Sequence, residues 1–208
     1  MNTDTSRKWD ALSRRFDLLT FADDRRFGPH KRRLFRKMCG ETLLVGVGTG
    51  NDIKFLPPGL HVLAIDISPK MLERAARKVG GYAGFIEFRE MDVQHLAFPD
   101  STFDTVVSVC TFCSVPKPIV GLRELHRVLK PGGQLLMFEH VRSQFGPLGV
   151  LMDVMTPLVS RIGPALNRDT VGNVQQAGFR LHRVENVYLD IVKTIEALKG
   201  AAVAQADQ

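Results

Sequence analysis

A glycine-rich loop is the clearest candidate for ligand binding in this chain. Gly46, Gly48 and Gly50 follow an apolar, β-branched run and precede a short helical pattern, so we expect them to connect a buried strand to a helix. Glycines at this place let a nucleotide approach the backbone, because ligands of open α/β sheets bind beyond the carboxyl ends of the strands. A tight connection that binds nothing would show the same glycines, so the interpretation needs support from other residues.

The spacing of this loop and a later acid narrow the choice of nucleotide. The third glycine of a dinucleotide-binding motif would fall where the chain has Asn51, and the chain contains no P-loop lysine motif. Phosphate binding is therefore disfavoured. Asp66 ends the next apolar run, 20 residues after Gly46, where its carboxylate can accept hydrogen bonds from both hydroxyls of a ribose. The alternative is that Asp66 caps a helix or is a solvated loop acid.

Glu139 and His140, at the end of a later apolar run, are the candidate catalytic residues. At a strand end they should face the same cleft, where either could act as a base or bind a polar head group. A structural hydrogen bond is the alternative for His140. Cys110 and Cys113 have C-x-x-C spacing, but zinc needs four ligands and the three cysteines include no second pair, so we expect no metal site. Cys113 could instead line the pocket as a small apolar residue.

A doubly wound α/β domain would bring these residues together, and the hydropathy pattern predicts one. Residues 41 to 140 alternate β-branched runs with helical patterns, as parallel sheets with crossover helices do. The expected strands are Thr42–Val47, His61–Asp66, Gly84–Arg89, Thr105–Cys110 and Gln134–Glu139. The expected helices between them are Asn51–Leu56, Pro69–Val79 and Pro118–Leu129.

The C-terminal third should complete the sheet. A helix is expected from Asp169 or Thr170 to Gly178. Phe179–Tyr188 and Ile191–Leu198 are separated by a short connection, which predicts an antiparallel hairpin at the sheet edge. The expected fold is therefore a mostly parallel, seven-stranded sheet with a C-terminal antiparallel hairpin.

Three further segments resemble, in order and spacing, those of the class I S-adenosylmethionine-dependent methyltransferases, which have a Rossmann-like fold. They are Glu90–Met91–Asp92–Val93 with Phe98–Pro99–Asp100, then Phe103–Asp104, then Arg127–Val128–Leu129–Lys130–Pro131–Gly132–Gly133. The resemblance covers about residues 40 to 140. It implies that the chain is an enzyme with S-adenosylmethionine as cofactor and S-adenosylhomocysteine as product.

The same resemblance implies which residues bind the cofactor. The methionine portion would be surrounded by the loop residues Gly46, Val47, Gly48, Gly50 and Asn51. Asp66 would hold the ribose, and the backbone around Cys110 would reach the methionine amino group. The adenine would be contacted by Asp92 and Val93, and packed by Ile67 and Met71.

Within that class the chain looks most like the quinone and phospholipid methyltransferases, and especially the membrane-associated thiol methyltransferases. The similar segments are Lys54–Phe55–Leu56–Pro57–Pro58–Gly59, Cys113–Ser114–Val115 and Phe138–Glu139–His140. One position departs from the family, which usually has an acid two residues before the first loop glycine, where this chain has Leu44. The methionine amine must then find another partner, for which Asp52 is the candidate, or cofactor affinity is reduced.

The net charge of +6 arises entirely in the first 40 residues, which hold 11 Lys and Arg and 5 Asp and Glu. A basic segment of this kind predicts an anionic partner, or it keeps the chain soluble. In the predicted N-terminal helix, one face carries Trp9, Leu12, Phe16 and Leu19, and Lys8, Arg14 and Arg15 lie away from it. This pattern is typical of a helix that lies on an anionic membrane, but the apolar stripe could equally cap the sheet.

The rest of the chain predicts a cytoplasmic protein, peripheral on a membrane at most. The apolar runs are all shorter than the about 20 residues that a spanning helix needs, and the first ten residues lack the apolar region of a secretory signal. The apolar, Met-rich segment Phe145–Pro164 should form a helix that Pro157 kinks or ends, and it would be one wall of a lipophilic pocket. Its expected apolar face consists of Leu148, Leu151, Met152, Met155 and Val159.

The leading functional hypothesis is methyl transfer to a lipophilic acceptor, with a phospholipid amine head group ahead of a thiol or a quinone precursor because of the basic segment. Nucleic-acid methylation is the second hypothesis, but no Asn/Asp-Pro-Pro-Tyr/Phe motif and no basic surface with interleaved aromatics support it. The third is a cofactor-binding module without catalysis, which Leu44 suggests. We expect a monomer with one domain at 1–200, followed by a disordered tail at 201–208. The domain would consist of a basic segment (1–40), a cofactor-binding core (41–140), and acceptor-pocket helices with the hairpin (141–200).

Overall fold

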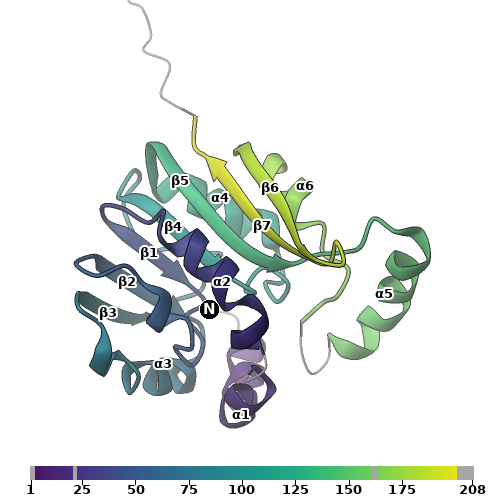
Figure 1. The fold of residues 1–208 in the computed structure, drawn as a ribbon, viewed down its shortest axis with the longest axis horizontal. Helices are drawn as coiled ribbons and strands as arrows, with labels where there is room; N and C mark the ends of the chain where they lie inside the picture. Colours follow the sequence, from purple (N-terminus) through teal and green to yellow (C-terminus); the bar gives the residue numbers. More distant parts are fainter. Residues whose placement is uncertain (1–2, 21–22, 161–163, 201–208) are drawn as a thin grey trace, which may run out of the picture.

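A computed structural model of the chain describes residues 3–20, 23–160 and 164–200. The strands within these residues are β1 (Thr42–Val45), β2 (His61–Asp66), β3 (Phe85–Glu90), β4 (Phe103–Val109), β5 (Leu129–His140), β6 (Arg180–Tyr188) and β7 (Val192–Leu198). They form one sheet in the order β3-β2-β1-β4-β5-β7-β6 (Figure 1). The strands β1 to β5 are parallel, and β7 runs antiparallel between β5 and β6. The predicted fold class is confirmed.

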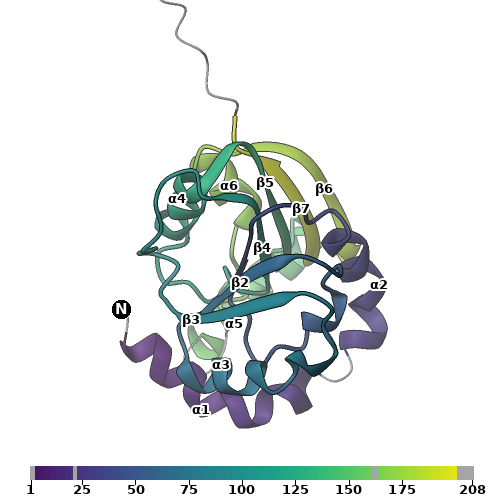
Figure 2. The ribbon, with the colours of Figure 1, turned by 90° about the vertical axis from the view of Figure 1, so that its left-hand side faces the viewer.

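Helices cover both faces of the sheet because alternate strand residues face opposite sides (Figure 2). Leu43 and Val45 of β1 belong to a core that includes residues of α4 (Pro118–Val128) and α6 (Thr170–Gln176). Leu44, between them, belongs to the opposite core, which includes residues of α2 (Asp23–Phe35) and the 3₁₀ turn η1 (Ile53–Phe55). A strand buried on both faces reads as a continuous apolar run, as β1 does.

The remaining described helices lie around the sheet and its ends. They are α1 (Thr3–Thr20), α3 (Pro69–Ala76), the 3₁₀ turn η2 (Val79–Gly81) and α5 (Gly146–Val159). Ser68 caps α3 by accepting a hydrogen bond from the Met71 amide, and its hydroxyl donates to Asp10 of α1 at 2.5 Å. α1 thus lies against α3, while α5 stands away from the sheet at the right of Figure 1.

Most element boundaries differ from the sequence prediction by one to three residues, and two elements differ by more. The helix expected at Asn51–Leu56 is only the turn η1, because two prolines follow it and leave no room for another turn. β5 begins at Leu129 and not at Gln134, since Leu129 pairs with Phe103 before a register shift. Of the two effects predicted for Pro157, it does not end the helix, since α5 continues to Val159; a proline this close to the end interrupts few helical hydrogen bonds. The tail predicted at 201–208 lies outside the described residues.

Candidate functional site

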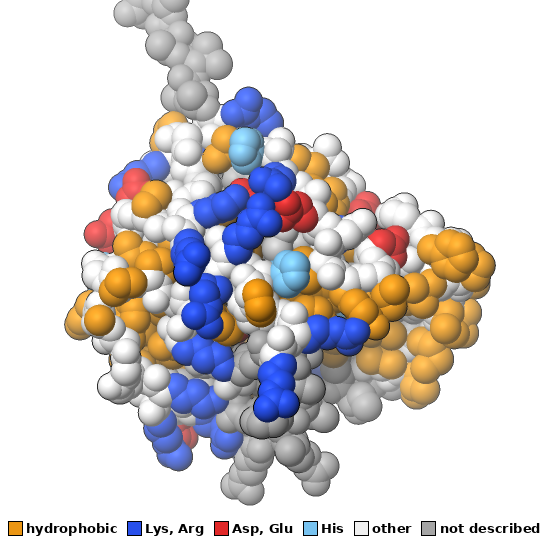
Figure 3. Space-filling view, in the orientation of Figure 1, with side chains coloured by type: hydrophobic (Ala, Val, Ile, Leu, Met, Phe, Trp, Pro, Cys, Tyr) orange, Lys and Arg blue, Asp and Glu red, His pale blue; other side chains and the backbone are white. Residues whose placement is uncertain are grey.

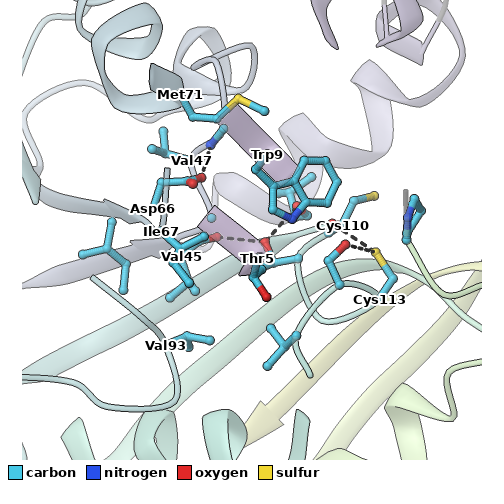
Figure 4. Close-up of a pocket in the computed structure, with 18 of the residues that line it drawn as sticks. Thr5, Trp9, Val45, Val47, Asp66, Ile67, Met71, Val93, Cys110 and Cys113 are labelled. Carbon is cyan, nitrogen blue, oxygen red and sulfur yellow. Dashed lines mark hydrogen bonds between the residues drawn. The ribbon is translucent and has the colours of Figure 1, made fainter. Parts of the chain in front are cut away.

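A cavity of about 300 Å³ lies at the carboxyl ends of β1, β2 and β4. Its walls include residues 45–49 at the end of β1, 65–67 at the end of β2, 91–94 after β3, and 109–111 and 113–116 at the end of β4. Thr5 and Trp9 from α1 also line it (Figure 4), as does Lys31 from α2. Ligands of open α/β sheets bind in this place, and the volume is within the range of small-molecule sites.

The glycine loop brings the backbone to the cavity wall. The amides of Gly46 and Val47 donate to the Ile65 carbonyl at 2.8 and 3.1 Å, which joins the ends of β1 and β2. Gly46 has φ of 66°, and a Cβ at this residue would lie 2.2 Å from the Thr111 hydroxyl oxygen. Glycine is therefore required here by both backbone conformation and space.

The other predicted loop residues have different places. Gly48, with φ of 56°, and Asn51 line the cavity together with Gly46 and Val47. Gly50 is not among the described lining residues. A Cβ on Gly50 would lie 2.8 Å from the Ala75 Cα, so this glycine allows the loop to pack against α3.

Asp66 lies on the cavity wall with its carboxylate held by two backbone amides. Gly48 N donates to Oδ2 at 2.8 Å and Ser68 N donates to Oδ1 at 3.0 Å. Burial raises the pKa of Asp66 to about 6, although these hydrogen bonds lower it. Each carboxylate oxygen can accept a further hydrogen bond, so the side chain remains able to bind hydroxyl groups. Ser68, not Asp66, is the residue that caps α3.

An apolar slot beside Asp66 fits a nucleoside base. Ile67, Met71 and Val93 line it, and Met71 is only 2% exposed. Asp92 also lines the cavity, and its carboxylate accepts hydrogen bonds from the amide and the side chain of Gln94. An apolar slot flanked by Asp66 and Asp92 is suited to a flat base with a ribose attached.

A partly buried ion pair lies at the cavity wall on the side of α2. Lys31 Nζ is 2.8 Å from Asp52 Oδ1, both residues line the cavity, and Lys31 is 8% exposed. Leu44 is 2% exposed within the core, where it does not replace an acid. The sequence indicated Asp52 but not Lys31, because a lysine in a basic helix 21 residues away reads as part of the surface charge.

Glu139 and His140 are not among the described residues that line the cavity, so the orientation predicted for them is corrected. Glu139 is completely buried beneath residues 110–113. Its Oε1 accepts hydrogen bonds from the Ser108 hydroxyl at 2.8 Å, Thr111 N at 3.0 Å and Phe112 N at 3.3 Å. Burial raises the pKa of Glu139 to about 7, and burial lowers the pKa of His140. Glu139 therefore supports a cavity wall from behind.

Cys110 and Cys113 both line the cavity. Cys110 has φ of 49°, an uncommon conformation for a residue with a side chain, and its amide donates to the Phe138 carbonyl at 2.8 Å. Burial raises the pKa of the Cys113 thiol to about 12 and that of Cys110 well above its usual range. Both thiols are thus protonated near neutral pH. Within the described residues there is no cluster of His, Cys, Asp and Glu that could hold a metal ion.

The described half of α1 faces the cavity. Figure 4 draws Thr5 and Trp9 in the middle of the lining side chains. Asp10 accepts the Ser68 hydrogen bond, and Lys8 Nζ donates to the Ser160 carbonyl at 2.8 Å. Trp9 of the predicted apolar stripe thus lines the cavity, and polar contacts hold α1 against α3 and the end of α5. The side chains of Arg14, Arg15, Phe16 and Leu19 lie outside the described residues.

The helix predicted to form a wall of the pocket does not do so. Of the described part of Phe145–Pro164, only Pro164 lines the cavity. On the expected apolar face of α5, Met152 is buried but Leu151 is 56% exposed and Met155 is 39% exposed. The periodicity predicted an apolar stripe on this helix. Polar contacts on the opposite side of α5 orient the helix so that much of the stripe is exposed to solvent.

Comparisons with known proteins identify the family. A family profile described as a methyltransferase domain matches residues 43–137. The human thiol S-methyltransferase TMT1B is 33% identical over 178 residues, which cover 78% of this chain and 72% of that enzyme. The chain belongs to the S-adenosylmethionine-dependent methyltransferases. Its methyl donor is accordingly S-adenosylmethionine.

Other relatives of this methyltransferase act on different acceptors. The phosphatidylethanolamine N-methyltransferase of Cereibacter sphaeroides is 36% identical over 126 residues, which cover 60% of this chain and 62% of that enzyme. The demethylmenaquinone methyltransferase of Thermus thermophilus is 29% identical over 208 residues, 98% of this chain and 90% of that enzyme. The relatives therefore agree on the family, while their names denote a phospholipid, a thiol and a quinone precursor as acceptors.

Solved structures agree on the fold of the methyltransferase. An S-adenosylmethionine-dependent methyltransferase from Thermotoga maritima has a TM-score of 0.68 at 19% identity, covering 92% of this chain and 99% of that one. The cyclase SpnF has the same TM-score and identity, covering 85% of this chain and 80% of that one. Because a cyclase shares the fold, the fold alone does not determine the reaction. Among the described helices, none has an apolar stretch sufficient to cross a bilayer.

Proposed function

We propose that this methyltransferase acts on a lipophilic acceptor, and that the acceptor is the amine head group of a phospholipid. The observation that carries the proposal is the apolar character of the cavity wall beyond Cys110. This part of the lining includes Cys113, Val115, Pro116 and Pro164, with Trp9 from α1. The relationship to the phosphatidylethanolamine enzyme and the exposed arginines of α2 support a phospholipid in particular.

An apolar cavity also helps an amine to react. An alkylammonium has no free lone pair near neutral pH, and burial in a poorly hydrated site lowers its pKa. The cavity can thus supply the free amine without a dedicated base. This is consistent with Glu139 and His140 being absent from its described lining.

The cofactor site fits S-adenosylmethionine. The cofactor supplies an electrophilic methyl group on a sulfonium. In this proposal Asp66 accepts hydrogen bonds from the ribose, while Ile67, Met71 and Val93 pack against the adenine and Asp92 holds its edge. Residues 41–140 thus supply most of the cofactor contacts, and Trp9 and Pro164, from outside this segment, line the part of the cavity left for the acceptor.

We assign the methionine end of the cofactor to the Lys31–Asp52 pair. A free amino acid end carries both a carboxylate and an ammonium, and the pair offers one complementary charge to each. Both side chains line the same cavity as Cys110. This arrangement would compensate for Leu44, and it argues against a module that binds its cofactor only weakly.

Glu139 acts in the proposal as a positioning residue. Its carboxylate accepts hydrogen bonds from the amides of Thr111 and Phe112, and Thr111 lines the cavity between Cys110 and Cys113. A displaced wall would spoil the in-line geometry that methyl transfer requires, with the reacting atoms about 3 to 3.5 Å apart.

A thiol acceptor is the second candidate. The absence of Glu139 and His140 from the described lining of the cavity favours it too, because a thiol with a pKa of about 8.5 needs little help to ionise. The wide match to the thiol S-methyltransferase TMT1B is consistent with this alternative.

A direct acceptor screen tests the proposal. The protein would be incubated with methyl-labelled cofactor and either phosphatidylethanolamine vesicles, an alkyl thiol or a demethylated quinone. We expect label in the phospholipid, and much less with the Asp66→Ala protein as control when the cofactor concentration is below saturation. Label in the thiol alone would replace the proposal by its alternative, and tight cofactor binding without any product would indicate a non-catalytic module.

A further inference from the structure

The helix α5 exposes an apolar face that nothing in the described part of the chain covers. Its exposed side chains, with that of the preceding Phe145, are Phe145 (65%), Val150 (58%), Leu151 (56%), Val154 (69%), Met155 (39%) and Leu158 (62%). Figure 3 shows this face as an apolar projection at the right of the molecule. Helices of globular proteins normally turn such a face toward the core.

Polar contacts hold α5 with this face outward. Asp153, the one charged residue of the helix sequence, accepts hydrogen bonds from Arg142 Nη2 at 2.8 Å and from Asn167 Nδ2 at 3.1 Å. The hydroxyl of Thr156 accepts a hydrogen bond from Leu166 N at 3.2 Å. The polar side of α5 therefore faces the protein and the apolar side faces away, which is the reverse of the usual arrangement.

The apolar face is continuous along the helix. Leu151, Val154 and Leu158 follow the i, i+3, i+7 spacing of one helical face, and Phe145 extends it at the N-terminal end. A helix of 14 residues is about 21 Å long, too short to span a bilayer of about 30 Å. Its dimensions suit a helix that lies in the surface of a membrane.

The face of the molecule from which α5 projects has the charge that anionic lipids require. The outer side of α2 exposes Arg25, Arg26, Arg32, Arg33 and Arg36. Figure 3 shows basic side chains gathered on the same face of the molecule as the apolar projection. An apolar helix and a basic surface on one face of the molecule match the two parts of an anionic bilayer, its acyl region and its head groups.

We propose that α5 inserts its apolar face into an anionic lipid bilayer. The contact places the cavity near the lipid surface, because Pro164 of the lining follows α5 and Lys8 ties α1 to Ser160 at its end. The inference does not depend on the phospholipid as acceptor, since a membrane anchor serves any lipophilic substrate.

Vesicle flotation with a matched pair of variants tests the proposal. The vesicles contain equal parts of phosphatidylcholine and phosphatidylglycerol. We expect the wild-type protein to float with them at low salt, and the Leu151→Gln, Val154→Gln, Leu158→Gln protein to bind at least tenfold more weakly. The control, Phe85→Gln with Val120→Gln, changes exposed apolar residues on β3 and α4 and should bind like wild type.

Further measurements separate the other outcomes. Equal cofactor affinity by calorimetry would show that all variants are folded, because α5 contributes no described residue to the cavity. Wild-type flotation of the triple variant, or no flotation of the wild type, would overturn the proposal. So would a wild-type dimer in ultracentrifugation that the triple variant converts to a monomer, since a second copy would then cover the face. Flotation without phospholipid methylation would reject the proposed acceptor only.

Discussion

Lowering the pH from about 7.5 to about 5 should weaken S-adenosylmethionine binding about tenfold, because Asp66 then loses its charge. The pKa of Asp66 is raised by burial to about 6. If only the carboxylate binds the ribose hydroxyls, the fraction able to bind falls from nearly all to about one tenth across this range. Isothermal titration calorimetry across this pH range measures the change directly.

The stability of the free protein should change in the opposite direction. An aspartate with a raised pKa binds its proton more readily when folded, so folding stability falls as pH rises from about 3.9 toward 6 and stays lower above it. The cost of holding Asp66 ionised is about 3 kcal/mol, from a shift of about two pKa units at 1.36 kcal/mol each. Glu139, whose pKa is raised to about 7, adds a cost of the same sign.

Two variants isolate the contribution of Asp66. Asp66→Asn should keep an acceptor for the Gly48 amide but remove the titration, so its cofactor affinity should be weaker and nearly independent of pH. Asp66→Ala should lose about 1.5 to 3 kcal/mol of binding free energy. The reasoning is refuted if wild-type affinity is constant over this pH range, or if Asp66→Asn retains the full pH dependence.

Three other changes should have distinct effects. Glu139→Ala should lower the melting temperature and should reduce kcat more than it reduces cofactor affinity. Glu139→Gln should largely restore the melting temperature and kcat. Equal turnover of the Ala and Gln variants would show that Glu139 has no positioning role. Lys31→Gln or Asp52→Asn should weaken S-adenosylmethionine binding about tenfold, as loss of a charged hydrogen bond does. Neither change should alter the affinity for methylthioadenosine, because this compound lacks the amino acid end. Gly46→Ala should abolish cofactor binding in calorimetry, because its Cβ would meet Thr111 at 2.2 Å; wild-type affinity would show that the loop adapts.

Local sequence signals were sufficient to predict the sheet and many of the residues that line the cavity. Buried parallel strands must be apolar on both faces, so β1 and β4 were visible as continuous runs. The glycine loop and Asp66 were found because they directly follow such runs, and parallel strands end at one edge of the sheet. These features depend on backbone geometry and on residues close in the chain.

The tertiary structure decided how the side chains are turned and which distant residues meet. Lys31 reaches Asp52 only because α2 packs over the loop after β1, and no local pattern encodes that contact. At the end of β5, the hydrogen-bonding amides of residues 111 and 112 draw the Glu139 side chain beneath the cavity wall.

The orientation of α5 is the third such case. Its sequence determined a helix with an apolar stripe, but a stripe does not specify which side meets the protein. The ion pair between Asp153 and Arg142 and the contact of Asp153 with Asn167 set the rotation of the helix. Partners of this kind come from segments that only the folded chain brings together, so the sequence determined the stripe and the tertiary structure decided that it faces outward.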